Sequence, residues 1–274
     1  MRRMTSWRVM GWVPDLSLRA LHFERLRRIF LYQEVLAIRL DKIDALRAKR
    51  PKRLPLVLTP EEVDKLLDNM DGRPLLMSEL SYGSGMRLME CLRGRVKDYD
   101  LDRNEITVRD GKGEKDRVTM LPLSVRERLI EHLAKVRDLH QKDLRIGLGR
   151  APLPYALARK YPNADRQWGW QYVFPASGHY VDRHTGVRHR HHLHETVVQK
   201  AFRRAVIEAD ISKPATFHTL RHAFATELLT TGHDIRTIQE LLGHKQVDTT
   251  MIYTHVLNRG GRGVQSPLDR RRRK

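Results

Sequence analysis

Residues 216–255 read TFHTLRHAFATELLTTGHDIRTIQELLGHKQVDTTMIYTH, and they carry the clearest helical pattern of the chain. Apolar residues recur every three or four positions, which predicts amphipathic helices. Gly232 and Gly243 are typical of the residue after a helix end, while Asp234 and Asp248 are typical of a helix start. The stretch therefore predicts three short helices separated by hinges.

Four polar side chains of this stretch have the chemistry to surround one phosphodiester: His218, Arg221, His244 and Tyr253. His218 and Arg221 are three positions apart, so a helix places them on one face, which we expect to look outward. Tyr253 falls late in the last predicted helix. The apolar stripe expected to anchor the first helix consists of Phe217, Leu220, Phe224 and Leu228.

The charge balance indicates a polyanionic partner. The 274 residues include 52 Lys and Arg against 33 Asp and Glu, a net charge of +19. Such an excess favours nucleic acid, with a solubilising surface charge or a ribosomal type of protein as the alternatives. The N-terminus lacks the apolar core of a signal peptide, and no run approaches the roughly 18 apolar residues of a membrane span.

Cysteine and histidine usage argues against a structural metal. The single cysteine, Cys91, excludes an intramolecular disulfide and a Cys-rich zinc site, and is simplest to explain in the cytosol. A histidine cluster follows residue 183, but it lacks both the HExxH spacing and a nearby cysteine, so we predict no metal ligands. Its members are His184, His189, His191, His192 and His194.

The first sixty residues predict a helical segment and a linker. Apolar spacing over residues 16–46 predicts one or two amphipathic helices. Residues 48–60 combine basic residues with prolines and show no helical period; we place the boundary at 51–60, where Lys52 and Arg53 suit a DNA backbone. Thr59, Pro60 and Glu62 then form the start signal of the next helix.

The middle of the chain predicts helices around a β-hairpin. Residues 73–98 predict two helices meeting at Gly83-Ser84-Gly85, a turn that projects Arg87, with Glu90 as its brace or as a plain surface partner. EITVR (105–109) and RVTML (117–121) predict a hairpin with Lys112 and Lys115 at its tip. Further amphipathic helices are predicted over residues 122–144 and 197–207.

Residues 147–188 are the least regular part of the chain. Trp168, Trp170 and Tyr172 either cement an irregular core or stack on unpaired bases. Any single ring is more simply a packing residue. For the segment as a whole we expect nucleic-acid contact.

The polar residues together predict metal-free cleavage of a phosphodiester. Arg87 and Arg221 supply forked donors for the charge that develops on the phosphoryl oxygens. Tyr253 is the predicted nucleophile, His218 its base and His244 a hydrogen-bond donor to the phosphate. Lys112 is the predicted acid for the 5′ leaving oxygen, with Lys115 as the alternative. A metal nuclease would require clustered carboxylates, which do not accompany this set.

These motifs identify a family resemblance. The pattern H-x-x-R, then LLGH, then a tyrosine nine residues after that histidine resembles the tyrosine recombinase family. KYPNADRQWGWQYVFPA (160–176), RHHLHE (190–195) and YTHVLNRGGRGVQSPLD (253–269) resemble the integron integrases more narrowly. The resemblance runs from about residue 28 to the C-terminus.

The resemblance implies a mainly α fold with a small antiparallel β-sheet and a catalytic domain over residues 61–269, with an insertion around 150–190 and a basic tail at 270–274. It implies site-specific integration and excision of gene cassettes in the bacterial cytoplasm, at the nucleoid, without a cofactor. The implied partners are double-stranded attachment sites, folded single-stranded cassette sites and three further copies of the chain. The DNA contacts it implies are Lys52, Arg53, Lys115, Trp168, Trp170, His191 and His192.

The N-terminal part departs from the family pattern. Residues 1–50 resemble only the end of a helical core-binding domain, so we expect a truncated remnant of that domain. The alternative function is therefore a DNA-binding but recombination-deficient remnant. A second alternative is a topoisomerase-like relaxing activity that uses the same residues without strand exchange.

Overall fold

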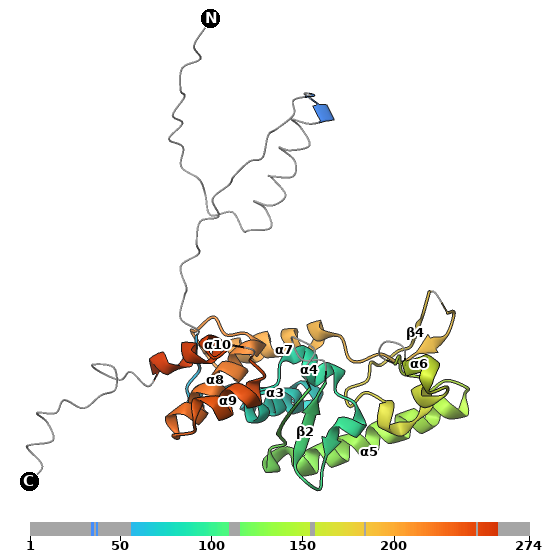
Figure 1. Ribbon diagram of the computed structural model, residues 1–274, viewed down its shortest axis with the longest axis horizontal. Helices are drawn as coiled ribbons and strands as arrows, with labels where there is room; N and C mark the ends of the chain where they lie inside the picture. Colours follow the sequence, from blue (N-terminus) through green and yellow to red (C-terminus); the bar gives the residue numbers. More distant parts are fainter. Residues whose placement is uncertain are drawn as a thin grey trace, which may run out of the picture. The chain divides into compact units, whose positions relative to one another are not determined.

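The computed structural model describes residues 34–35, 37, 56–109, 116–153, 157–183, 185–244 and 246–256. The chain divides into two compact units, residues 1–52 and 53–274, and the fold below is that of the second unit (Figure 1). The domain boundary at 51–60 stays a prediction. Several other predictions lie outside the described residues: the helices of 16–46 except for residues 34, 35 and 37, together with Lys52, Arg53, the hairpin tip with Lys112 and Lys115, His184, and the tail.

Helices dominate this unit, and the predicted class of a mainly α fold with small antiparallel sheets is confirmed. Short 3-10 turns connect several of the helices. The α-helices are α2 (Pro60–Asp68), α3 (Gly72–Ser84), α4 (Leu88–Arg93), α5 (Leu123–Arg145), α6 (Leu157–Lys160), α7 (Glu195–Glu208), α8 (Phe217–Thr230), α9 (Ile235–Leu242) and α10 (Asp248–Met251). The 3-10 helices are η2 (Val96–Asp98), η3 (Ala164–Arg166), η4 (Trp168–Trp170) and η5 (Ile252–Val256).

The predicted hairpin is present as β2 (Glu105–Val108) and β3 (Arg117–Met120), paired antiparallel with Ile106 opposite Thr119. A two-residue strand, β1 (Tyr99–Asp100), adds to its edge and was too short to predict. A second small sheet of β4 (Tyr180–Val181) and β5 (Arg188–His189) lies inside the irregular segment.

Local start signals are confirmed where side chains cap helices. Thr59 Oγ1 accepts a hydrogen bond from the Glu62 amide at 3.3 Å, and Glu62 Oε2 accepts one from the Thr59 amide at 2.8 Å. Asp234 caps α9 by accepting from the Thr237 amide at 3.0 Å. Such caps satisfy amides that the first helical turn leaves without partners.

The core is organised around α3, which packs against α5, α7 and α8. Its Met77 and Leu80 are fully buried, as are Phe174 from the irregular segment and Leu220 from α8. Each such side chain contributes about 1.5–3 kcal/mol through removal of apolar surface from water. A smaller apolar cluster joins α8, α9 and η5 and includes Tyr253.

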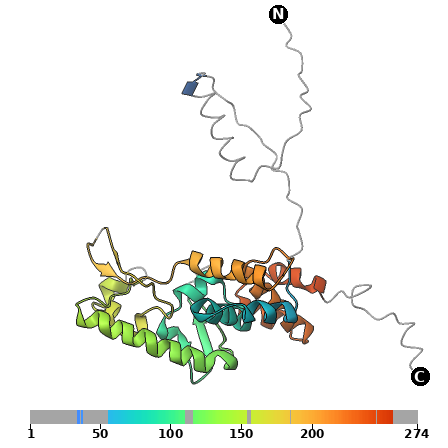
Figure 2. The same cartoon turned by 180° about the vertical axis from the view of Figure 1, so that it is seen from behind.

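The segment of residues 150–190, which the resemblance implies to be an insertion and which is called the insertion below, follows α5 in the chain. Figure 1 and Figure 2 show α8, α9 and α10 gathered at one end of the unit, with the β4 hairpin and α6 at the other. Asp143 of α5 accepts hydrogen bonds from Arg190 Nε at 2.6 Å and Nη2 at 2.8 Å. Arg190 Nη1 also donates to the carbonyls of Ala176 and Ser177, so one buried guanidinium ties the insertion to α5.

Within the described ranges, no helix has both the length and the apolar character needed to cross a bilayer.

Candidate active site

Arg87 stands at the turn between two helices, as predicted. Gly85 ends α3 in the left-handed region, with φ at +68°, and Arg87 is the residue before α4. Glu90 Oε2 accepts from the Arg87 amide at 2.8 Å, and Oε1 accepts from Arg87 Nη1 at 2.7 Å. The Glu90 side chain is only 9% exposed, so Glu90 braces Arg87 and the two do not form a plain surface pair.

Glu90 also joins this turn to the hairpin. Arg117, at the start of β3, donates Nη1 to Glu90 Oε1 and Nη2 to Oε2, and its Nε donates to the Leu241 carbonyl at 2.8 Å. Burial opposes ionisation of Glu90, but the Arg117 and Arg87 guanidiniums outweigh it and lower the pKa of the carboxyl to about 2. Arg117 could not be predicted from local sequence patterns, because its partners Glu90 and Leu241 are 27 and 124 residues away in the chain.

Arg221 is buried, so the prediction that it looks outward was wrong. Its side chain is 1% exposed; Nη1 donates to the Gly85 carbonyl and Nη2 to the Leu242 carbonyl, each at 2.5 Å. These carbonyls belong to the ends of α3 and α9, where helices leave acceptors unsatisfied and favour a cation. Nε is buried without a partner in the described part of the protein. Burial and then Arg87 lower the pKa of Arg221 to about 9, which leaves it charged at neutral pH.

Two histidines, His218 and His222, lie about one turn apart on α8. His218 lies at the exposed start of the helix, and its ring meets that of His222 edge to face at 4.7 Å. Partial burial lowers the pKa of His218, and repulsion from Arg221 and Arg87 lowers it further. Sequence reasoning missed His222, although its i,i+4 spacing from His218 was a usable signal.

Tyr253 is 1% exposed and lies in η5, directly after α10. Its hydroxyl is hydrogen-bonded to Nδ1 of His222 at 2.8 Å. Burial raises the pKa of the phenol, while the charges of Arg221 and Arg87 oppose that rise. Asp248 is the first residue of α10, so the helix start predicted there is confirmed.

His244 follows Gly243, which ends α9 with φ at +64° as predicted. Its Nδ1 is hydrogen-bonded to Thr250 Oγ1 at 2.9 Å, and its ring lies nearly parallel to that of Tyr253, 6.4 Å away. Burial, followed by repulsion from Arg221 and Arg87, lowers the pKa of His244 to about 3. The ring is therefore neutral at neutral pH.

The structure thus brings five of the six predicted catalytic residues to one place. Arg87 and Arg221 both reach Glu90, the latter at 3.9 Å, while His222 and His244 flank the Tyr253 ring. Lys112, the sixth, lies outside the described residues.

The predicted aromatic contacts divide between two environments. Trp170 lines a cavity of about 530 Å³, where Lys97 Nζ lies 3.0 Å from the centre of its ring. His191 and His192 line the same cavity with their ring centres 4.0 Å apart. Burial, with His192 next, lowers the pKa of His191 to about 4. The remaining lining residues are Arg93, Arg95, Asp98, Arg109, Asp116, Pro152, Leu153, Leu157 and Tyr172.

Trp168 packs elsewhere. Its ring lies 6.1 Å from that of His140 on α5, and the side chain rests against the main apolar core. The Arg137 guanidinium lies 5.8 Å from the ring centre. For Trp168 and the buried Tyr172, the structure favours the packing role over base stacking.

Comparison with known proteins identifies the family. Residues 56–259 match the model of the phage integrase family. The chain belongs to the phage integrase family of tyrosine recombinases.

Named relatives of this recombinase carry general descriptions. An integrase/recombinase of Escherichia coli is 51% identical over 242 residues, which are 88% of this chain and 72% of that protein. Tyrosine recombinase XerD of Oceanobacillus iheyensis is 32% identical and aligns with 76% of this chain and 60% of that protein. Among these names, the common term is recombinase, and none specifies integrons.

Solved recombinases share the fold. XerA recombinase aligns with 86% of this chain and 71% of its own, with a TM-score of 0.51 and 27% identity. XerH site-specific recombinase bound to difH substrate aligns with 88% of this chain and 63% of its own, with a TM-score of 0.53 and 25% identity. The predicted catalytic-domain fold of tyrosine recombinases is thereby confirmed.

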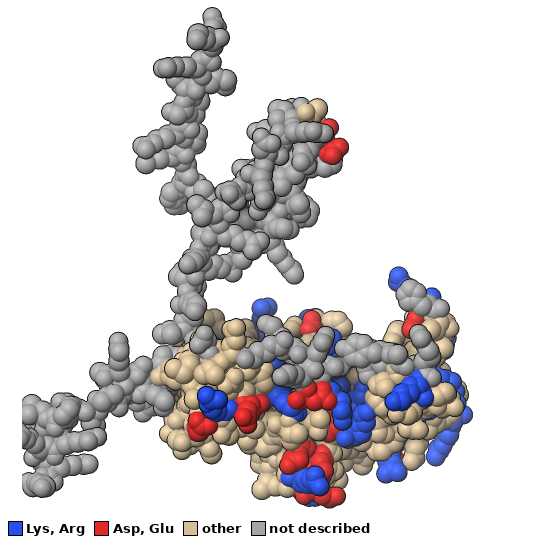
Figure 3. Space-filling view, in the orientation of Figure 1, with Lys and Arg blue, Asp and Glu red and all other residues tan. Residues whose placement is uncertain are grey.

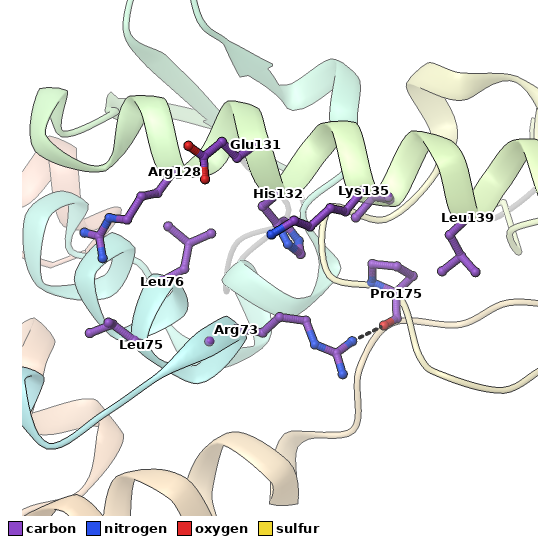
Figure 4. A pocket seen from close by; sticks show the side chains of 11 residues that line it. Arg73, Leu75, Leu76, Arg128, Glu131, His132, Lys135, Leu139 and Pro175 are labelled. Carbon is purple, nitrogen blue, oxygen red and sulfur yellow. Dashed lines mark hydrogen bonds between the residues drawn. The ribbon is translucent and has the colours of Figure 1, made fainter.

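A separate hollow of about 440 Å³ lies between the start of α3 and α5 of the recombinase (Figure 4). Arg73 crosses its edge and donates Nη1 to the Pro175 carbonyl at 3.0 Å. None of the residues that line it belongs to the group around Tyr253. Among the described side chains, no three His, Cys, Asp or Glu residues gather as a metal site would require.

Proposed function

We propose that this recombinase cleaves and rejoins DNA at specific sites through a covalent bond between Tyr253 and a 3′ phosphate. The observation that carries the proposal is the convergence of two guanidiniums, three imidazoles and one phenol at a single place. Both guanidiniums lie beside the Glu90 carboxylate. The phenol is hydrogen-bonded to the His222 ring, and its own ring lies nearly parallel to that of His244.

Arg87 and Arg221 would hold the phosphoryl oxygens. The transition state of phosphoryl transfer carries charge on the non-bridging oxygens, and prepositioned donors stabilise it at little reorganisation cost. Among the described residues Arg221 Nε has no hydrogen-bond partner, whereas both Nη atoms are hydrogen-bonded, which supports a donor role of Nε toward an anion. His244, neutral at neutral pH, would donate a further hydrogen bond.

In the proposed reaction the tyrosine oxygen displaces the 5′ oxygen from phosphorus. Tyr253 Oη would form a bond to phosphorus, the bond from phosphorus to O5′ would break, and the phenolic proton would pass to a base. Lys112 stays our proposed acid for the leaving O5′, with Lys115 as the alternative. Because the phosphotyrosyl bond keeps the phosphodiester's energy, the 5′ hydroxyl of another strand can reverse the step without ATP.

DNA is the proposed partner. The net charge of +19 supports it, and Figure 3 shows Lys and Arg as prominent charged side chains over the insertion end of the visible face. XerH, whose fold this chain shares, has been solved bound to its difH substrate. We propose a homotetramer on two DNA sites as the assembly that exchanges strands.

Integron cassettes are the proposed substrate class. The cavity around Trp170, His191 and His192 is of a size typical of small-ligand sites, and basic side chains line it. An unpaired base projecting from a folded single strand would meet both an aromatic ring and positive charge there. This supports recognition of folded cassette sites in addition to duplex attachment sites.

The test is covalent capture. The full chain is incubated with folded single-stranded cassette-site DNA, and in parallel with a duplex attachment site, each nicked beside the scissile phosphate so that religation is impossible. We expect a protein–DNA adduct that survives denaturation and is absent with Tyr253→Phe. DNA binding without any adduct would favour the recombination-deficient alternative, and adduct formation on the duplex alone would remove the cassette-site proposal.

A further inference from the structure

The phenol of Tyr253 has its hydrogen bond with a histidine that the sequence motif did not single out. His222 Nδ1 lies 2.8 Å from the Tyr253 hydroxyl. This separation is within the range expected between a nucleophile and the base that activates it. Since Tyr253 is almost fully buried, the contact is not a passing one at the surface.

The two neighbouring imidazoles are differently engaged. His244 Nδ1 is bonded to Thr250 Oγ1, and the His244 ring faces the side of the phenol ring. The His218 ring meets the His222 ring edge to face, and it is His222 that contacts the phenol. Of these three histidines, His222 is the one whose ring nitrogen is hydrogen-bonded to the Tyr253 hydroxyl.

We infer that His222, and not His218, accepts the proton of Tyr253 as the phenol attacks the scissile phosphate, an assignment that rests on the proposed function. The proton moves from Oη to Nδ1 while the oxygen–phosphorus bond forms. The bond from phosphorus to O5′ breaks, and the leaving oxygen takes its proton from a separate acid. In the reverse step the imidazolium returns its proton to Oη.

The charges around His222 suit this role. Burial lowers the pKa of His222 to about 4, and repulsion from His218 and Arg221 adds to the effect. The facing groups are thus His218 and Arg221 on α8 itself and Tyr253 on η5. The ring is neutral before DNA binds, so a nitrogen lone pair is available, and an arriving phosphate would raise the pKa because a nearby anion favours the imidazolium.

The decisive variant is His222→Asn. An Asn side chain can accept the phenol's hydrogen bond but cannot take up its proton near neutral pH. We expect the first-order rate of adduct formation on the nicked substrate to fall about 10²- to 10⁴-fold at pH 7. We also expect the remaining rate to rise about tenfold per pH unit, because the proton must then pass to hydroxide. DNA affinity in a gel shift is expected to be unchanged.

His218→Asn is the matched control, since it alters the neighbouring imidazole on the same helix. We expect it to change the rate without creating the steep pH dependence. His222→Gly adds a second readout: free imidazole should restore its rate, and imidazoles of different basicity should restore it to different degrees.

The outcomes separate the two proposals. A wild-type chain that forms no adduct removes the proposed function and this assignment with it. A wild-type adduct combined with a His222→Asn rate within threefold of wild type, or reduced equally at every pH, overturns the assignment alone. A steep pH dependence in His218→Asn instead of His222→Asn would give the role to His218.

Discussion

Glu90 and Arg117 form a two-pronged ion pair, with Arg117 Nη1 and Nη2 lying 3.0 and 2.6 Å from the two carboxylate oxygens. The same carboxylate holds Arg87 and lies 3.9 Å from Arg221 Nη1. One acidic side chain thus offsets three guanidiniums that would otherwise repel one another. It also links α4, β3 and α8, so the hairpin base and both proposed phosphate-binding arginines depend on it.

Replacing this carboxylate by an amide should be costly. Glu90→Gln leaves buried guanidiniums without a counter-charge, and we expect the free energy of unfolding to fall by about 3–5 kcal/mol in urea denaturation. Glu208→Gln is the control, because its ion pair with Arg204 is exposed and should be worth about 0–1 kcal/mol. Equal losses in the two variants would contradict the role assigned to Glu90.

The same group predicts a dependence of stability on pH. The folded pKa of Glu90, about 2, lies below the ordinary value of 4.5, so its stabilisation is fully present above pH 4.5 and is lost as the pH falls toward 2. The difference corresponds to about 3 kcal/mol. Urea denaturation between pH 5 and pH 2 should show the loss in wild type and a shallower curve in Glu90→Gln. Parallel curves would disprove the linkage.

Local signals predicted most of the elements. The Thr59–Glu62 cap, the hairpin and the end of α9 at Gly243 each depend on residues within a few positions of one another, and all three are confirmed. Arg221 could not be predicted in the same way. Its partners Gly85 and Leu242 lie 136 and 21 residues away, so only the folded chain shows that this arginine is buried.

The sequence also left the partner of the nucleophile unidentified. His222 stands next to Arg221 in an evident motif, but its importance arises from a fold-back that brings Tyr253 across 31 residues. The helical periodicity of the sequence places His222 on α8, but it does not show which residue of η5 contacts His222.

Arg221→Lys should separate charge from geometry. The guanidinium donates to two helix-end carbonyls through its Nη atoms and keeps Nε as a further donor. An ammonium cannot reproduce this forked geometry. We expect adduct formation on the nicked substrate to fall at least about 10²-fold, with DNA affinity nearly unchanged. Arg236→Lys, an exposed substitution on α9, should cleave as wild type does. Near-normal cleavage by Arg221→Lys would show that charge alone suffices.

Gly85→Ala should disturb the turn that carries Arg87. Gly85 has φ at +68°, and an added Cβ would lie 2.6 Å from the Phe224 ring and 2.9 Å from the Leu242 side chain. Left-handed strain and overpacking together should lower the free energy of unfolding by about 2–4 kcal/mol. Gly178→Ala meets nothing within 4 Å and should change it by less than about 0.5 kcal/mol. Thermal or urea denaturation of both variants measures the contrast, and a neutral Gly85→Ala would contradict it.

Trp170 and Trp168 offer a test of whether the segment of residues 150–190 contacts an unpaired base. Trp170 lines the cavity that also holds His191 and His192, whereas Trp168 packs against α5 and the core. If an unpaired base enters that cavity, Trp170→Ala should weaken binding of a folded strand with an extrahelical base by about 1–3 kcal/mol, the usual worth of base–aromatic stacking. Binding of the same hairpin without the extra base should be unaffected.

The comparison with Trp168→Ala makes this prediction specific. That variant should lower the melting temperature through lost packing but should weaken both hairpins equally, if at all. Fluorescence anisotropy measures the affinities of wild type and the two variants for both hairpins, six in all. The salt concentration is held fixed because electrostatic binding varies with salt. An equal loss for both hairpins in Trp170→Ala would mean that the ring supports the insertion and that Arg93, Arg95 and Lys97 act on the backbone alone. A loss confined to the extrahelical base would assign the cavity to base recognition.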